Sequence, residues 1–298
     1  MIDYTSLEAL AEAALQGGVS IGELVLQDQA GQMEKRPEDL MEQMDGRLAV
    51  MEHSARAGSA PDIRSTSGLT GGDAFRMGAY AAKGGALSGD FCARAMATAL
   101  AVAECNASMG RIVASPTAGS CGILPGALLT MMDMRGASRE KTCLGLMTAG
   151  GVGLVLALQA TISGAEGGCQ AECGSAAAMA AAALVEMAGG NPDMAVQAAA
   201  MAIKNSMGLV CDPVAGLVEV PCIKRNAGAV MCAVAAADMA LAGIRSVIPA
   251  DEVIAAMREV GESLPCALRE TAQGGLAATP TAQALAATLF EGTGGEGR

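Results

Sequence analysis

The sequence predicts an all-α protein: a single compact helical domain of residues 1–298, in which glycine-rich loops connect buried helices rich in Ala and Met. First, hydrophobic residues make up 52% of the chain and charged residues only 17%, which is ample apolar surface for a folded core. Second, apolar runs of helix length alternate with clusters of Gly, Ser, Thr and Pro. Third, the alternation of Val, Ile, Thr and aromatic residues that is typical of strands is missing, and there are no Trp, two Tyr and three Phe.

Residues 1–60 are expected to form amphipathic helices. Thr5-x-x-Glu8 and Ser20-x-x-Glu23 each match a capping box, in which a hydroxyl and a carboxylate bind the free N–H groups at a helix start. Pro37, followed by two acidic residues, is typical of the first turn of a further helix that extends to about residue 57. This segment carries most of the long charged side chains and is expected at the surface.

Residues 61–282 form the predicted motif-bearing core, in which four loops separate the helices. The helices are expected at about 74–83, 90–106, 124–134, 139–162, 172–187, 193–205, 223–242 and 249–261. The loops are expected at 58–74, 115–122, 163–169 and 211–222. After an irregular stretch, the tail at 283–298 is expected to be briefly helical.

The composition also limits the kinds of partner. The formal net charge is −12, from 31 acidic and 19 basic residues, and aromatic residues are few. Such a chain lacks both the cations that neutralise phosphates and the rings that stack on bases, so no nucleic-acid partner is expected. His53 is the single histidine, so mechanisms that need two histidines are excluded, and its charged amphipathic segment favours a surface position.

A cytoplasmic location is expected, because the first residues are acidic where a signal peptide is basic, and they lack its apolar core. The ten cysteines are then expected as free thiols rather than disulfides. The uncharged stretches 142–165 and 113–132 are long enough to span a membrane. The first stretch contains several Gly and Thr residues, and the second contains Pro. This composition favours buried core helices, so no membrane contact is expected.

Two of the loops carry groups that can bind an anion. Residues 65–73 (STSGLTGGD) and 115–122 (SPTAGSCG) offer hydroxyls and backbone N–H groups next to helix N-termini. Neither is a Walker motif, because no Gly-Lys-Thr/Ser follows. Each loop taken alone is more typical of a simple turn.

Seven of the ten cysteines fall into two groups by position. Four lie inside expected helices and are typical of small buried hydrophobic residues: Cys92, Cys105, Cys143 and Cys232. Cys169, Cys211 and Cys222 instead lie at loop edges beside Gly or Pro, where thiolates can bind a soft metal. Cys173 is expected to point into the Ala-rich helix at 172–187. The spacing matches neither a zinc ribbon nor a bacterial ferredoxin, so spacing alone leaves a metal site open.

Five sequence blocks resemble, in the same order, those of the iron–sulfur-dependent L-serine dehydratases, specifically their α chain or α domain. The blocks are SGLTGGDA (67–74), SPTAGSCGILPG (115–126), GAEGGCQAECGSAAAMAAA (164–182), CDPVAGLVEVPCIKRNA (211–227) and RETAQGGLAATPT (269–281). The resemblance runs from about residue 60 to residue 282, and five ordered blocks make it highly specific.

The resemblance implies an enzyme that converts L-serine to pyruvate and ammonia without pyridoxal phosphate, in serine breakdown. It also implies a [4Fe–4S] cluster held by three cysteines, with one iron left open. By block-to-block matching, the ligands are Cys169, Cys211 and Cys222. An open iron is a Lewis acid that can assist departure of the serine hydroxyl, and its exposure to oxidants implies oxygen sensitivity. The family also has a second chain, with an α/β fold. A β subunit is therefore an expected partner, in addition to the substrate L-serine.

The substrate carboxylate needs hydrogen-bond donors. The two loops and the start of the helix expected at 223–242, just after Cys222, can supply them. The candidates are Ser67, Gly68, Thr70, Gly71, Thr117, Gly119 and Asn226. Lys224 is the candidate for the base that takes the α-proton, although a lysine needs burial to lower its pKa for that role. A solvated helix end is the alternative interpretation of Lys224.

Two other functions stay open at the level of the sequence. A related cluster-dependent lyase could act on another β-substituted amino acid such as L-cysteine, with sulfide as the leaving group. A non-catalytic helical subunit could use the three cysteines to bind zinc, or nothing.

Overall fold

The computed structural model describes residues 2 and 4–293, and these residues confirm the all-α prediction. The α-helices are α1 Leu7–Gly17, α2 Ile21–Gln32, α3 Pro37–Gly58, α4 Asp73–Ala82, α5 Gly89–Ala107, α6 Ile123–Arg135, α7 Arg139–Gln159, α8 Gly164–Gly167, α9 Ser175–Met187, α10 Pro192–Ser206, α11 Cys222–Leu241, α12 Ala250–Ser263 and α13 Pro280–Thr293. A π-helical turn, η1 Gln170–Gly174, precedes α9, and three short 3₁₀ turns are η2 Val214–Gly216, η3 Cys266–Leu268 and η4 Gly275–Ala278. Within the described residues, β-type pairing is limited to an isolated parallel bridge between Cys211 and Arg269.

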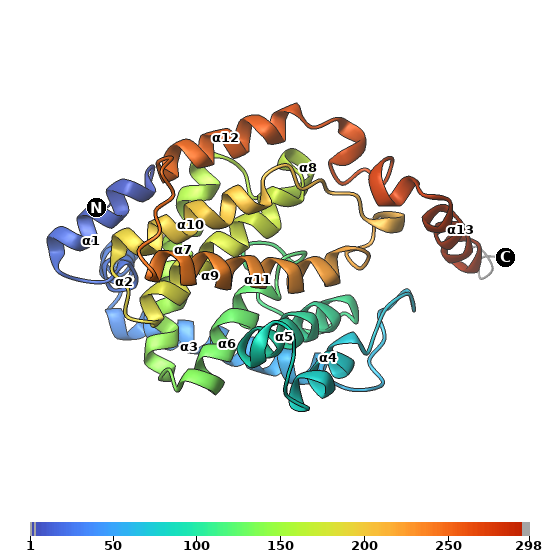
Figure 1. The fold of residues 1–298 in the computed structure, drawn as a ribbon, viewed down its shortest axis with the longest axis horizontal. Helices are drawn as coiled ribbons and strands as arrows, with labels where there is room; N and C mark the ends of the chain where they lie inside the picture. The colour runs from blue at the N-terminus through green and yellow to red at the C-terminus, as the bar shows by residue number, and fades with distance from the viewer. Residues whose placement is uncertain (1, 3, 294–298) are drawn as a thin grey trace.

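Helix α9 lies at the centre of the fold, where it packs on α6, α7, α10 and α11 (Figure 1). Its sequence, SAAAMAAAALVEM, buries every side chain except that of Glu186. Alanine has no side chain beyond Cβ, so neighbouring helices approach this one closely and share a dense core. The Ala-rich composition thus places α9, and the cysteine turn that leads into it, in the interior.

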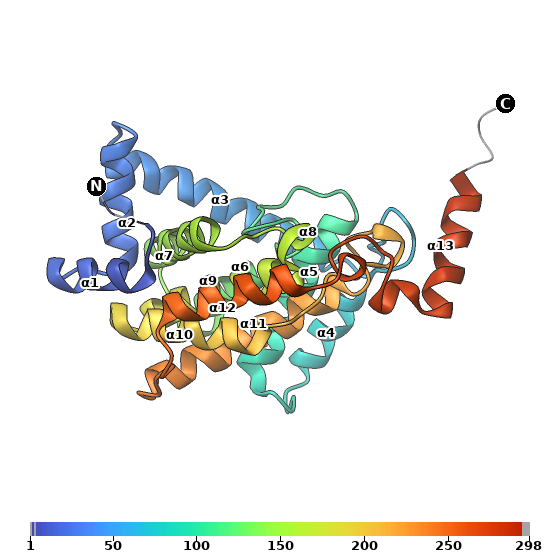
Figure 2. The ribbon, with the colours of Figure 1, turned by 90° about the horizontal axis from the view of Figure 1, so that it is seen from above.

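The two ends of the fold differ in how tightly they are packed. Helices α1 and α2 bury apolar faces against α10 and α7. Helix α13 packs on η2 and η4, and it lies beyond the main body of helices in both views (Figures 1 and 2). The predicted briefly helical tail is therefore α13 up to residue 293, and its last part, 294–298, lies outside the described residues.

Capping explains where several helices begin. The predicted capping box of α2 is confirmed, since the Glu23 backbone N–H donates to Ser20 Oγ at 3.1 Å and the Ser20 N–H to Glu23 Oε2 at 2.8 Å. The predicted box at Thr5 is wrong by one residue, because Ser6 is the N-cap of α1. Ser6 is fixed by a hydrogen bond to Asp251 on α12, at 2.6 Å, which local sequence does not reveal.

Two other boundaries differ from the sequence prediction. Helix α7 ends at Gln159 rather than near residue 162. The helix predicted at 172–187 is wrong at its start, because residues 170–174 form the π turn η1 and α9 begins at Ser175. The preceding stretch, predicted as a loop, contains the short helix α8.

Among the described residues, one helix, α7, is long and apolar enough to cross a membrane, and the bent pair α1–α2 passes the same test only when taken together. In α7, 61% of the apolar window is buried inside the fold. Burial of this kind is typical of a core helix.

Candidate active site

The three loop-edge cysteines come from separate segments that meet beside the N-terminal ends of α9 and α11. Cys169 lies between α8 and η1, Cys211 in the extended segment after α10, and Cys222 at the first position of α11. Cys169 and Cys211 are only 3% and 4% exposed. Burial raises the pKa of Cys222 to about 12 and also raises that of Cys211, and the Cys169 sulfur contributes to both increases. The three thiols are therefore electrostatic neighbours.

These thiols do not form a ready-made site for a single ion. Among the described residues, no group of three or more His, Cys, Asp or Glu side chains is arranged so that it could hold one metal ion. The pKa of Cys169 is lowered, first by a hydrogen bond with Cys173 and also by the charge of Arg225, against the effect of burial. Arg225 therefore places a positive charge where three thiolates would otherwise accumulate negative charge.

Cys173 differs from its predicted position. It lies in η1 rather than in the Ala-rich helix, and its Sγ is 3.4 Å from the Cys169 Sγ. Its pKa is raised well above the ordinary value, by the Cys169 thiol first and then by burial. Cys173 thus lies outside α9, and its thiol contacts that of Cys169, four positions earlier in the chain.

Glu172, in the same turn, is an acidic residue that the sequence analysis missed. Thr117 Oγ1 donates to Glu172 Oε1 at 2.7 Å, and the Cys211 thiol lies 3.9 Å from Oε2. A Cβ added at Gly119 would lie 3.2 Å from Oε1, and one at Gly164 would lie 2.5 Å from Oε2. Burial raises the pKa of Glu172 despite the hydrogen bond from Thr117. Its position between Cys169 and Cys173 in the sequence is the signal that could have identified it as a site residue.

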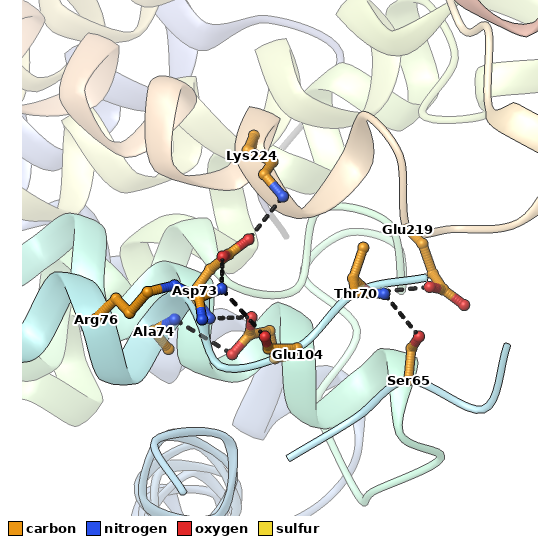
Figure 3. A network of polar contacts seen from close by, with 9 residues as sticks. Ser65, Thr70, Asp73, Ala74, Arg76, Glu104, Glu219 and Lys224 are labelled. Carbon is orange, nitrogen blue, oxygen red and sulfur yellow. Dashed lines mark hydrogen bonds and ion pairs between the residues drawn. The ribbon is translucent and has the colours of Figure 1, made fainter. Parts of the chain in front are cut away.

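The first predicted substrate loop is bonded to the protein itself. The Thr70 hydroxyl donates to Glu219 Oε2 at 2.9 Å, and the Thr70 N–H donates to Ser65 Oγ at 3.2 Å (Figure 3). The Ser67 hydroxyl donates to the same Glu219 oxygen at 2.9 Å. Glu219 is 5% exposed and lies between Cys211 and Cys222 in the chain. The loop is thus anchored to the cysteine segment through one buried carboxylate, which is a second residue that the sequence analysis missed.

Two glycines shape this loop in different ways. Gly71 has a φ of 145°, and a Cβ there would lie 2.2 Å from the Ile63 carbonyl oxygen. Gly68 has a φ of 78°, but a Cβ there would meet open space. Gly71 is therefore required for close backbone approach, and Gly68 only for its left-handed conformation.

The predicted base, Lys224, forms an ion pair. Figure 3 shows it reaching from α11 toward Asp73 at the start of α4, with Nζ 2.6 Å from Asp73 Oδ2. The Lys224 side chain is 59% exposed. Burial alone would raise the pKa of Asp73, but hydrogen bonds from Lys224 and Arg76 lower it. Beneath this pair, the buried Glu104 accepts hydrogen bonds from the Asp73 and Ala74 N–H groups at 2.7 and 3.2 Å.

Asn226 joins the second predicted loop to α11. Its Nδ2 donates to the carbonyl oxygens of Gly119 and Cys222 at 2.8 and 2.9 Å, and its Oδ1 accepts from the Gly122 N–H at 2.8 Å. The side chain is 1% exposed, and both amide donors are used. Asn226 therefore fixes the position of residues 115–122 relative to Cys222.

The last sequence block is held against Cys211. The Glu270 N–H donates to the Cys211 carbonyl oxygen at 2.8 Å, and the Cys211 N–H donates to that of Leu268, just before the block, at 2.9 Å. Asp212, which is buried, pairs with Arg225 at 2.8 Å and accepts from the Leu276 N–H at 2.7 Å. A cavity of about 640 Å³ lies alongside, lined by η2, residues 270–278 and the start of α13. The other four blocks are thus connected to the block at 211–227, which contains Cys211 and Cys222.

Comparison with known proteins matches the sequence of this chain to one family. The family model of the serine dehydratase alpha chain matches residues 16–277. The chain is 50% identical over 289 residues to the probable L-serine dehydratase, alpha chain, of Bacillus subtilis, covering 97% of this chain and 96% of the relative. It is 47% identical over 268 residues to the L-serine dehydratase, alpha chain, of Peptoniphilus asaccharolyticus, covering 90% and 92%.

A relative of another kind is a longer chain. The L-serine dehydratase 1 of Escherichia coli is 46% identical over 182 residues, which cover 60% of this chain and 40% of that protein. Both the length of the family match and the identity to the two alpha chains lead to the same assignment: the chain belongs to the serine dehydratase alpha chain family.

Proposed function

We propose that this chain is the catalytic α chain of an L-serine dehydratase, which converts L-serine to pyruvate and ammonia with a [4Fe–4S] cluster and a β subunit. The observation that carries the proposal is the meeting of three cysteine segments with both predicted substrate loops. The names of the alpha-chain relatives support L-serine as the substrate. A cytoplasmic location fits the free thiols, because a reducing compartment preserves them.

The residues present fit a cluster with three cysteine ligands. Cys169, Cys211 and Cys222 are soft donors on three segments, and the charge of Arg225 lies beside Cys169. Iron–sulfur clusters are held by cysteine thiolates, and a cluster is wider than one ion, so its ligands need not converge on a single point. When bound, a cluster with an open iron supplies a Lewis acid for the leaving hydroxyl.

The hydroxyl groups of the two loops are the donors that we assign to the substrate carboxylate. In the free chain those of Ser67 and Thr70 bind Glu219, and that of Thr117 binds Glu172. Each hydroxyl thus already donates to a carboxylate, which is the group that a substrate would present. Gly119 leaves room next to Thr117, because its missing side chain faces the Glu172 carboxylate.

Lys224 stays a prediction as the base for the α-proton. Its Nζ is held in an ion pair with Asp73, 2.6 Å from Oδ2. Removal of the proton by Nζ therefore requires that Asp73 first release the side chain. Asn226 has a positioning role in this proposal, because its amide is fully used between Gly119 and Cys222.

The β subunit is proposed from the family and from the length of the Escherichia coli relative. The Escherichia coli relative is a single chain, of which the matched region is 40%. A separate subunit would supply what the rest of that chain contains.

The test is turnover by the chain purified anaerobically with its β subunit. Pyruvate formation from L-serine, at a kcat/KM well above that for L-cysteine, would support the proposal. Faster release of sulfide from L-cysteine would instead indicate the related lyase that acts on L-cysteine. No turnover of either amino acid by a cluster-loaded complex would contradict the proposal.

A further inference from the structure

We propose that Cys169 and Cys173 are a modification site, at which the metal-free chain forms an intrachain disulfide when it meets a peroxide. The two sulfur atoms are in contact at 3.4 Å, and both side chains are buried. Other thiols are occupied differently: those of Cys121 and Cys232 lie against the backbone carbonyl oxygens of Val102 and Ala202, at 3.9 and 3.6 Å.

The geometry of the turn allows the bond to form. A disulfide needs a sulfur–sulfur distance of about 2.0 Å, so the two atoms must approach by about 1.4 Å. Both residues lie on one face of the same helical turn, since they are four positions apart. Gly168 and Gly174 flank the pair, and glycine backbones adjust more easily than others. A small side-chain rotation with a modest backbone shift is therefore sufficient.

The chemistry balances with a peroxide as the oxidant. The sulfur of one cysteine attacks a peroxide oxygen, the O–O bond breaks, and a sulfenic acid and one water form. The second sulfur then attacks the first, the S–O bond breaks, and the departing hydroxide takes the remaining thiol proton to give a second water. The two thiols lose two electrons and two protons in total, and the peroxide is reduced to two waters.

The disulfide itself does not depend on the proposed function, but its consequence does. If Cys169 is a cluster ligand, the disulfide removes that ligand reversibly and protects it from oxidation to sulfinic acid. A chain that loses its cluster would then be stored in a form that a thiol reductant restores.

Protease cleavage between the two cysteines gives a direct test. The metal-free full chain is treated with hydrogen peroxide, its remaining thiols are blocked, and it is denatured and digested with a protease that cuts after glutamate. Cleavage at Glu166, Glu172 and Glu186 separates GGCQAE (167–172) from CGSAAAMAAAALVE (173–186). We expect mass spectrometry to find these two fragments linked, and to find them separate after reduction.

A matched pair of variants completes the experiment. Cys143→Ser, on α7, is expected to leave the linked fragments unchanged, whereas Cys173→Ser is expected to abolish them and to give irreversible oxidation of Cys169. The proposal is overturned if the wild-type fragments separate without reduction, with Cys169 as sulfinic acid. It is also overturned if Cys169 is found linked to Cys211 or Cys222 instead. The wild-type result stands without the variants, so a variant that fails to fold does not obscure it.

Discussion

Thr70 Oγ1 donates a hydrogen bond to Glu219 Oε2 at 2.9 Å, across 149 residues of sequence. Ser67 donates to the same oxygen atom at the same distance. This single carboxylate oxygen ties a loop near the start of the chain to the segment between two cysteines. The position of the loop relative to the cysteines therefore depends on Glu219.

Replacing Glu219 with alanine should destabilise the fold and loosen the loop. The change leaves the buried Thr70 hydroxyl without its acceptor, at a cost of about 1–3 kcal/mol in the free energy of unfolding. Urea unfolding of the variant and of the control Glu259→Ala, an exposed residue on α12, provides the measurement. The control should stay within about 0.5 kcal/mol of the wild type. Equal stabilities of the two variants would contradict the anchoring role.

Lys224→Met should separate catalysis from stability. The Lys224–Asp73 pair is largely exposed on the lysine side, so its loss should cost about 0–1 kcal/mol in folding free energy. If Lys224 takes the α-proton, kcat should fall by about 100-fold or more. Steady-state kinetics on L-serine, with the exposed Lys141→Met on α7 as a control, measure this. An unchanged kcat would show that Lys224 is only a surface partner of Asp73.

Gly71→Ala and Gly68→Ala form a matched pair, because both glycines have positive φ in the same loop. The Cβ at position 71 would collide with the Ile63 carbonyl oxygen, whereas that at position 68 is free. We expect a loss of about 1 kcal/mol for Gly68→Ala, from its left-handed conformation alone. The loss for Gly71→Ala should exceed this by at least about 2 kcal/mol. Denaturant unfolding of both variants tests the order, which would be reversed if the loop could shift freely.

The pH dependence of stability should reflect Glu186, the one side chain of α9 that is not fully buried. Burial raises its pKa from the ordinary value of 4.5, although hydrogen bonds from Thr148, Ser20 and the Gly22 N–H lower it in part. The folded state therefore binds more protons than the unfolded state above pH 4.5. Its contribution to stability is fully present below that pH, and it is lost as pH rises through the raised pKa.

Glu186→Gln removes this titration. Urea unfolding between about pH 4 and pH 7 should show a smaller loss of stability with rising pH in the variant than in the wild type. Identical pH profiles would show that the carboxylate is not perturbed in the folded state.

Local sequence predicted most of the helices, because their start signals act within a few residues. Ser138 accepts from the Lys141 N–H at the start of α7, and Asn191 accepts from the Met194 N–H just before Pro192 in α10. The cap of α1 was missed, since Ser6 is held by Asp251, which lies 245 residues away. The π turn was missed because no composition pattern marks a single turn of i→i+5 bonding.

The candidate site was predicted in part for a related reason. The motif residues meet as expected around the cysteine segments, but their partners did not stand out in the sequence. Glu219 and Glu172 were missed because their hydrogen bonds to Thr70 and Thr117 join segments far apart in the chain. Cys173 was assigned to the Ala-rich helix because the sequence does not mark the π turn at residues 170–174.

The central claim is that three cysteines hold an iron–sulfur cluster. The most direct measurement is iron and acid-labile sulfide per chain, on protein purified anaerobically with its β subunit, for the wild type and for Cys169→Ser, Cys211→Ser, Cys222→Ser and Cys143→Ser. We expect about four of each in the wild type and in Cys143→Ser, and loss of both in the other three variants. Wild-type protein that is folded but contains neither iron nor sulfide would contradict the account, as would a cluster retained in any of those three variants.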